Sequence, residues 1–590
     1  MPLSSFGALP DGGGTRFRLW APAAARVDLV LDDGRTLPME VGGGVHERRV
    51  DGVGAGARYR YRLDGGAPLA DPASRFQPEG VHGPSEVVDP AAYRWRTAGW
   101  QPPAQRDLVF YELHVGAFTP EGTFAAAAER LERLRDLGVT AVELMPVADF
   151  PGRWNWGYDH AALYAPSRAY GRPDDLRALV DRAHALGLAV VLDVIYNHLG
   201  PDGAYLAAVG PVFTDRHETP WGQAVNLDDE GSEGLRAFFL DNARHWLAEY
   251  RLDGLRLDAT HALKDESAVH FLQALSERVA GMAPKRFLIA EDHRNLNRLL
   301  LPRPEGYGLD AVWTDDLHHQ VRNLTAGDTA GYYADFAGTT AADLAVTLRQ
   351  GWFYDGRPSR RTGEPRGTSP ARVRPEQCVV CIQNHDQVGN RPTGNRLTDD
   401  VSPAAYRAAS ALLLFAPELP LLFMGQEWAA STPFQFFTDH NAELGRAVSE
   451  GRRAEFEDFP GFSGEVPDPQ DPATFRRSTL DWAEPERPGH AHTLALYRAL
   501  LALRRSLAGP AAAESHGERS LHVRRRGHHL LVTFGTNVAL PLPAEAEAVL
   551  HTEQSAYAWD PVPPQIEGLR VRFARPGAMV LRTRGPEGAS

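Results

Sequence analysis

The stretch LVFYELHV at residues 108–115 is a nearly continuous apolar run, and VTAVELM at 139–145 is a second one. Between them, apolar residues recur at helical spacing from Thr123 onward, and Gly138 stands where the C-cap glycine of a helix belongs. Strand, helix and strand in this order form one βαβ unit. Such a unit predicts parallel strands that are covered by helices.

The same alternation continues along the chain, with helical patterns at 173–187 and 232–250. Six further apolar runs of strand length stand at 189–196, 254–258, 286–291, 309–313, 378–382 and 419–424. Eight such strands, with helical patterns between most of them, predict a closed barrel. A doubly wound open sheet is the alternative, but the sequence lacks the Gly-rich phosphate loop that normally follows its first strand.

The two flanks of this region have the shorter, alternating runs of antiparallel sheets. TRFRLW at 15–20 and ARVDLVL at 25–31 alternate between apolar and polar residues, and short strands such as LLVTF at 530–534 return near the end of the chain. We therefore predict an α/β protein with a TIM (β/α)₈ barrel over residues 101–508. An N-terminal β-sandwich precedes it at 1–100, and a C-terminal β-sandwich follows at 509–590.

The composition limits the partners of the protein. The formal net charge is −14, so the average field repels a polyanion such as nucleic acid but does not repel a neutral ligand. The N-terminal residues lack a basic segment followed by an apolar run, and no stretch approaches the roughly 18 uninterrupted apolar residues of a membrane span. Two cysteines are too few for a disulfide scaffold. We expect a cytoplasmic protein without nucleic-acid or membrane partners.

The two cysteines form a C-x-x-C pair, Cys378 and Cys381. A zinc site would need two more ligands at matching spacing, and none is evident. Positions three apart on a strand also point to opposite faces. We therefore expect two core thiols.

Polar residues end four of the predicted barrel strands: His198, Asp258, Glu291 and Asp386. Catalytic groups of a (β/α)₈ barrel project from the C-terminal ends of its strands. A single acid at a strand end is unremarkable, because the residue that follows a strand commonly faces water. Three acids and several histidines on one rim predict an active site.

Three carboxylates without a His/Cys metal cluster suit glycoside hydrolysis, which needs one carboxylate as a nucleophile and another as a protonated acid. Glu291 follows the apolar run 287–290, where burial would raise its pKa. Asp258 lies two residues after Arg256, so both point to the same side of the strand, and the cation would keep the aspartate ionised. A retaining enzyme would hold the two carboxyl groups about 5–5.5 Å apart.

Four segments resemble the conserved regions of the α-amylase superfamily, glycoside hydrolase family 13. They are DVIYNH at 193–198, GLRLDATH at 254–261, IAED at 289–292 and QNHD at 383–386. Their order and their places on the third, fourth, fifth and seventh strands match as well. The resemblance implies Asp258 as nucleophile, Glu291 as acid/base and Asp386 as the carboxylate that grips the distorted sugar.

The same resemblance implies sugar contacts around the cleaved bond. The residues concerned are Arg256, His198, His261 and His385, together with Tyr158 and Trp156 in WGYDH at 156–160. Family members that bind calcium often use the asparagine that corresponds to Asn197. Because no acidic cluster completes such a site in the sequence, we expect no required metal and no cofactor.

Further segments resemble the maltooligosyltrehalose trehalohydrolases of this superfamily. They are GYYADF at 331–336, NHDQVGNR at 384–391, and FFTDH at 436–440 followed by GRR at 451–453. TRFRLWAP at 15–22 resembles the carbohydrate-binding-like sandwich that the group shares with branching enzymes, and YGLDAVWTDDLHH at 307–319 resembles both. The reaction implied is hydrolysis of the α-1,4 bond next to a terminal trehalose.

Recognition of the trehalose unit needs groups beyond the cleavage point. The loops after the sixth and seventh strands supply the candidates Asp315, His318, His319, Arg322, Gln387, Asn390 and Arg391. Aromatic residues that could stack on sugar faces are Trp154, Trp156, Tyr332, Tyr333 and Trp428. A glycogen branching enzyme is the alternative within the superfamily, and a binding-only relative is a third hypothesis. The sequence is silent on oligomeric state.

Overall fold

The computed structural model of the protein describes residues 5–583, apart from residue 221 and residues 458–464. Its centre is a closed barrel of eight strands in which every neighbouring pair is parallel, and the last strand pairs with the first. The strands are β9 (Phe110–Leu113), β10 (Ala141–Leu144), β13 (Ala189–Val194), β16 (Gly254–Leu257), β17 (Phe287–Glu291), β18 (Ala311–Trp313), β21 (Cys378–Val380) and β22 (Leu419–Phe423). The predicted (β/α)₈ barrel is confirmed, and each strand is shorter than the apolar run that predicts it.

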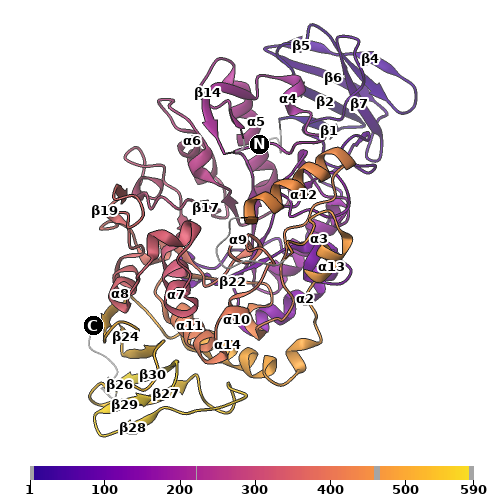
Figure 1. Cartoon of the computed structure of the whole chain (residues 1–590). Helices are drawn as coiled ribbons and strands as arrows, with labels where there is room; N and C mark the ends of the chain where they lie inside the picture. Colours follow the sequence, from indigo (N-terminus) through magenta and orange to yellow (C-terminus); the bar gives the residue numbers. More distant parts are fainter. Residues whose placement is uncertain (1–4, 221, 458–464, 584–590) are drawn as a thin grey trace.

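Helices surround the barrel as the alternation predicts (Figure 1). Helix α2 (Phe124–Leu137) begins where the Thr123 side chain accepts a hydrogen bond from the backbone of Ala126, and it ends at Gly138 with φ +109°. The other long helices are α3 (Pro173–Ala185), α5 (Ser232–Glu249), α6 (Phe271–Ala280), α7 (Asp316–Ala326), α8 (Ala341–Gln350), α11 (Pro403–Phe415), α12 (Ala442–Glu457) and α14 (His490–Arg504).

Short elements stand in the loops at the C-terminal ends of the strands. The hairpin β14 (Phe213–Thr219) and β15 (Gly222–Val225) follows the third strand, and the hairpin β19 (Asp355–Pro358) and β20 (Pro365–Gly367) follows the sixth. Other short elements are α1 (Val115–Phe118), β11 (Ala148–Asp149), β12 (Ala162–Pro166), α4 (Leu206–Val209), α9 (His385–Gly389), α10 (Leu397–Asp400) and α13 (Pro472–Arg477).

The inside of the barrel changes from apolar to charged along the strands. Val191 and Ile289 belong to the buried apolar cluster that fills the lower part. Two residues further along the same strands stand Asp193 and Glu291, on the same face because side chains alternate. Arg256 on β16 pairs in register with Asp193 and Ile289. The strand period therefore carries the charged groups to the C-terminal mouth.

The two cysteines point to opposite sides of the barrel wall, as predicted. Cys378 begins β21, and Cys381 follows the end of this strand directly. Cys381 belongs to the apolar cluster inside the barrel, whereas Cys378 belongs to the larger core outside it. Both are buried and free. Burial raises the pKa of both thiols well above the usual value, so they are inert core groups.

The N-terminal region is a β-sandwich of two four-stranded sheets, ordered β1-β2-β6-β5 and β4-β3-β7-β8. The strands are β1 (Gly7–Asp11), β2 (Gly14–Trp20), β3 (Val27–Leu31), β4 (Thr36–Pro38), β5 (Glu40–Gly42), β6 (Val45–Asp51), β7 (Arg58–Leu63) and β8 (Ser85–Glu86). A buried ion pair ties this region to the barrel, since Arg75 Nη2 lies 2.7 Å from Glu249 Oε1 at the end of α5.

The C-terminal region has sheets β23-β24-β25-β30-β27 and β26-β29-β28, which share a buried apolar cluster and so form the predicted second sandwich. The strands are β23 (Ala512–Ser515), β24 (Ser520–Arg525), β25 (His528–Thr533), β26 (Val538–Pro541), β27 (Ala546–His551), β28 (Gln565–Glu567), β29 (Arg570–Phe573) and β30 (Gly577–Thr583). The two sandwiches lie at opposite ends of the molecule (Figure 1).

The predicted domain limits near 100 and 509 fall between regular elements, after β8 and between α14 and β23. Within the described residues, no helix combines the length and the apolar character that crossing a membrane requires.

Candidate active site

The side chain of Arg256 is the centre of the charged group at the barrel mouth. Its Nη1 lies 2.7 Å from Asp193 Oδ2 and 2.7 Å from Asp258 Oδ1, and its Nη2 lies 3.1 Å from Glu291 Oε2. The guanidinium is fully buried and packs over the ring of Trp313 at 4.4 Å. One cation from the fourth strand therefore holds carboxylates from the third, fourth and fifth strands.

The backbone directly after Asp258 is turned toward Glu291. Ala259 has φ +40°, a left-handed conformation that costs a residue with a Cβ about 1–2 kcal/mol. In this conformation its N–H donates to Glu291 Oε2 at 2.6 Å. Backbone strain at this position therefore serves to aim a donor at the acid.

The two carboxyl groups held by Arg256 have opposite pKa shifts. Burial raises the pKa of Glu291 to about 8, and the nearby charges of Asp258 and Asp386 add to the rise against the pull of Arg256. Burial also acts on Asp258, but Arg256, His198 and a hydrogen bond from Asn197 outweigh it and hold the pKa below its usual value. At neutral pH the site therefore contains a protonated Glu291 beside an ionised Asp258.

Asn197 is used to orient Asp258. Its Nδ2 donates to Asp258 Oδ2 at 2.9 Å, and its Oδ1 lies 2.6 Å from Nδ1 of His198. The other ring nitrogen of His198 lies 2.9 Å from the backbone oxygen of Tyr158. These contacts fix the imidazole and the aspartate relative to each other.

A second hydrogen-bonded chain begins on the first strand, passes through His385 after the seventh strand and ends on the third strand. Glu112 Oε1 lies 2.5 Å from His385 Nδ1, and His385 Nε2 lies 2.7 Å from the hydroxyl of Tyr158, which donates to Asp193 Oδ2 at 2.7 Å. The rings of Tyr158 and His385 are stacked, with centroids 5.3 Å apart. Burial opposes protonation of His385, but Asp386 and Glu112 outweigh it and raise the pKa of the imidazole to about 9. His385 is therefore a buried cation below this pH.

These groups open into a cavity of about 880 Å³. Its lining includes Asp258, Glu291 and Asp386. Five of the predicted sugar contacts also line it: Trp156, Tyr158, His198, His261 and Asn390. Phe436, which is not among the predicted contacts, lies in the same lining. Carboxylates and aromatic side chains therefore line the same cavity.

A second cavity of about 950 Å³ adjoins the first. The two share His293, Asp386 and Asn390 in their linings. Four residues predicted to contact sugar line the second cavity: Asp315, His319, Gln387 and Tyr332. Residues of the β19–β20 hairpin, between 359 and 367, line it as well. Together the two cavities form a continuous cleft that begins at the acids and extends over the sixth strand.

Several predicted sugar contacts lie outside the linings of these two cavities. Arg256 and His385 are buried beneath the cleft. His318 is fully buried, with its Nδ1 2.8 Å from the oxygen of Ile382. Arg322 and Arg391 both pair with Asp328 and Asp400. These partners within the protein favour roles in positioning the site over direct sugar contact.

Three of the predicted aromatic platforms are also packed against protein groups. Trp154 stacks on Phe475 at 5.6 Å, Trp428 is buried with its N–H 3.2 Å from Glu484 Oε2, and Tyr333 is buried with its hydroxyl 3.3 Å from Nε2 of His318. The apolar faces of these three side chains are buried against other residues of the protein instead of facing a cavity. Trp156 and Tyr332 are the two that line the cavities.

The cleft also contains residues that the sequence analysis does not single out. His293 lines both cavities, and Arg294, Arg361, Arg366 and Asp335 line the second. His293 follows the fifth-strand motif directly, so its place at a strand end is a signal that sequence reasoning misses. Asp335 lies in the segment GYYADF, whose resemblance assigns this residue no role, and Arg366 lies on β20. No local pattern marks these two residues, Arg294 or Arg361 as part of a cleft.

Comparisons with known proteins agree with this architecture. The family model "Alpha amylase, catalytic domain" matches residues 90–215, and "Carbohydrate-binding module 48 (Isoamylase N-terminal domain)" matches residues 5–91. The crystal structure of a "Putative alpha Amylase" from Salmonella typhimurium superposes with a TM-score of 0.90 at 38% identity, covering 98% of this chain and 100% of that one.

A malto-oligosyltrehalose trehalohydrolase from Deinococcus radiodurans is 51% identical over 512 residues, which are 85% of this chain and 83% of that protein. The chain belongs to the malto-oligosyltrehalose trehalohydrolase family. The predicted membership of the α-amylase superfamily is confirmed with it.

The branching enzymes, our alternative, are more distant from this trehalohydrolase-family chain. A 1,4-alpha-glucan branching enzyme from Nocardia farcinica is 34% identical over 463 residues, which are 70% of this chain and 58% of that enzyme. Both the identity and the coverage are lower than for the trehalohydrolase relative.

Proposed function

We propose that the protein hydrolyses the α-1,4-glucosidic bond next to the terminal trehalose of a maltooligosyltrehalose, releasing trehalose and a shorter maltooligosaccharide. The observation that carries the chemistry is the shared guanidinium of Arg256, which contacts both Asp258 and Glu291. This arrangement keeps the two carboxyl groups at one pocket, as a retaining mechanism requires.

In the first step, a carboxylate oxygen of Asp258 attacks the anomeric carbon of the sugar at the cleavage site. The bond from that carbon to the leaving oxygen breaks, and Glu291 gives this oxygen its proton. Arg256 and Asn197 keep the nucleophile ionised and oriented. The products of this step are a glycosyl ester on Asp258 and free trehalose.

In the second step, the ionised Glu291 takes a proton from water while the water oxygen attacks the same anomeric carbon. The ester bond breaks and Asp258 leaves as a carboxylate. We assign Asp386 to the hydroxyl groups of the distorted sugar, because it stands at the junction of the two cavities. The imidazolium of His385, 3.4 Å from Asp386 Oδ1, holds that carboxylate.

The presence of two adjoining cavities is in keeping with a substrate that has a maltooligosyl end and a trehalose end. A trehalose unit has no reducing end, so its recognition depends on hydrogen bonds to hydroxyl groups on both rings. Asp315, His319, Gln387 and Asn390 supply such groups at the walls of the cleft, and Tyr332 offers a ring face. We also assign the enzyme to the cytoplasm, in keeping with its two unpaired cysteines.

The test is product analysis with maltotriosyltrehalose and, separately, amylose. We expect free trehalose and maltotriose from the first and little reaction with the second. New α-1,6 branches on amylose without trehalose release would identify a branching enzyme. Binding of the oligosaccharide without any product would identify a binding protein.

A further inference from the structure

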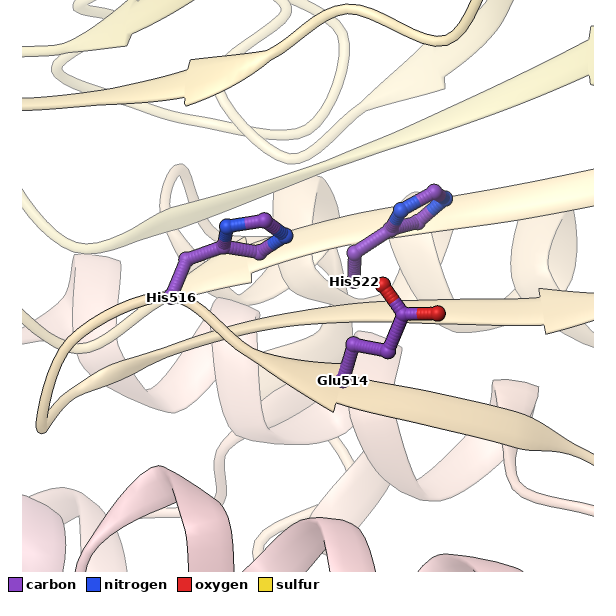
Figure 2. A group of neighbouring side chains, drawn as sticks. All are labelled: Glu514, His516 and His522. Atoms are coloured by element: carbon purple, nitrogen blue, oxygen red, sulfur yellow. The ribbon is translucent and has the colours of Figure 1, made fainter.

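A cluster of potential metal ligands stands on the C-terminal sandwich, far from the catalytic cleft in the fold. Glu514 on β23 pairs directly with His522 on β24, and His516 lies two residues beyond Glu514 in the turn that joins these strands. Directly opposed residues and residues two apart share one face of an antiparallel pair. Figure 2 shows the carboxylate and both imidazole rings on the same side of this hairpin.

The ligand atoms of the three side chains are close enough for one ion. One atom from each residue lies within 4.8 Å of the others. Tetrahedral zinc with ligand bonds of about 2.0–2.2 Å needs them somewhat closer, and side-chain rotation within an exposed turn can supply the difference. Nε2 of His516 is a buried atom without a hydrogen-bond partner, and Figure 2 shows this ring directed toward His522.

The second ring nitrogen of His522 is already held as it is in metal sites. His522 Nε2 lies 2.9 Å from His529 Nδ1, and His529 Nε2 lies 2.9 Å from the Thr583 hydroxyl. A histidine that binds a metal through one nitrogen typically donates the other N–H to an acceptor, which fixes the tautomer. Here His522 can donate to His529 and leave its Nδ1 lone pair for a metal.

One contact within the protein competes with a metal ion at this cluster. The competing contact is the pair between Glu514 and Arg524, whose side chains are about half exposed. An exposed pair of this kind contributes little to stability, so it is a weak competitor.

A second group of similar composition, His217, Asp228 and Glu266, is a useful contrast. There Arg216 already pairs with both Asp228 and Glu266 and supplies the positive charge. In the C-terminal cluster the neighbouring cation, Arg524, pairs with Glu514 among the three ligands. The geometry therefore favours the C-terminal cluster for a metal ion.

We propose that Glu514, His516 and His522 form a zinc site with an open fourth position for water. Two nitrogen ligands and one carboxylate suit zinc, whereas calcium and magnesium prefer oxygen ligands throughout. The hairpin that carries the site lies against helix α8 of the barrel. The backbone N–H of Ala341 donates to the backbone oxygen of Glu518 at 2.7 Å. Arg349 Nη1 donates to the backbone oxygen of Ala513 at 2.7 Å. Zinc there would stiffen the contact between the sandwich and α8.

The test uses the full-length protein without an affinity tag, treated with a chelator and titrated with zinc against a chromophoric competitor. We expect the wild type to bind one zinc more than the variant His516→Ala/His522→Ala. His529→Ala should weaken this zinc by about 10–100-fold, as loss of the hydrogen bond behind a ligand does. His528→Ala, on the neighbouring position of β25, is the matched control and should bind like the wild type.

Trehalose release by each variant reports that the chain is folded, because these residues lie outside the catalytic cleft. If the double variant is inactive, Glu514→Gln replaces it, since this side chain is exposed. Cobalt as a probe should give the visible absorption of a four-coordinate ion in the wild type and lose it in the variants. Equal zinc stoichiometry in wild type and variants, or no zinc bound by the wild type at micromolar concentration, would overturn the proposal.

Discussion

The two cavities of the cleft meet at His293, Asp386 and Asn390, yet they are built in different ways. The cavity that contains the acids is lined by charged side chains at the ends of barrel strands. On two of these strands a carboxylate stands two residues after a buried apolar residue and therefore on the same face. The second cavity is lined largely by loop residues between 293 and 390, many of them outside regular strands. The first has fixed charges around one guanidinium, and the second has polar and aromatic groups spread over a wide wall.

This difference separates chemistry from specificity. Bond cleavage needs groups held rigidly, and the strands and the buried Arg256 supply that rigidity. Recognition of one sugar end over another needs a surface that can vary without disturbing the barrel, and loops supply it. Substitutions in the first cavity should therefore act on kcat, and substitutions in the second on KM and substrate preference.

The largest effect is expected for Asp258→Asn. The amide keeps the shape of the side chain but cannot form the glycosyl ester, so kcat should fall by at least about 10³-fold while maltooligosaccharide binding is largely kept. Steady-state kinetics together with calorimetric binding check this. Turnover near that of the wild type would refute the assignment of the nucleophile.

Glu291→Gln should lower kcat by about 10²–10⁴-fold and also change the pH profile. In the proposed mechanism the reaction requires protonated Glu291, whose pKa is raised to about 8. Activity should therefore be kept below this pH and fall as the pH rises through it. The acid limb should lie below the usual range of an aspartate, because Arg256 lowers the pKa of Asp258.

The variant Glu291→Gln should lack the alkaline limb, since the amide has no proton to lose in this range. Rates measured from pH 4 to pH 10 decide the point. An alkaline limb that persists unchanged in the variant would assign it to another group.

Arg322→Met tests a residue that lies behind the second cavity. Its buried guanidinium contacts Asp328 and Asp400, and its loss should destabilise the protein by about 2–3 kcal/mol, less than for a fully buried pair because the carboxylates are partly exposed. The midpoint of denaturation should fall with kcat little changed. Arg372→Ala removes a pair that is half exposed at both partners and is the control, with no measurable shift.

The smallest effect is expected for Tyr332→Ala. The ring lines the second cavity, and its loss should raise KM for maltotriosyltrehalose by about three- to tenfold, with kcat nearly unchanged. Tyr332→Phe keeps the ring and should behave like the wild type. A drop in kcat without a change in KM would place this tyrosine in the chemistry instead of in recognition.

The sequence predicts much of the first cavity because its signals are local. The period of two along a strand carries Arg256 and Asp258 to the same side, and the alternation of strands and helices brings eight strand ends to one rim. The sequence does not show which side chains contact each other. Only the structure shows that Arg256 contacts three carboxylates. It also shows that Glu112 on the first strand contacts His385 after the seventh, 273 positions away.

The sequence by itself determined the barrel, its two flanking sandwiches and the positions of Asp258, Glu291 and Asp386. Hydrophobic periodicity and the ends of strands can be recognised from residues that are neighbours in the sequence. Only the tertiary structure decided which candidates face the cleft. His319 lines the second cavity while its neighbour His318 is buried, and Arg322 is held by Asp400, 78 positions further on. Loop conformation depends on contacts between distant segments, and no local pattern encodes such contacts.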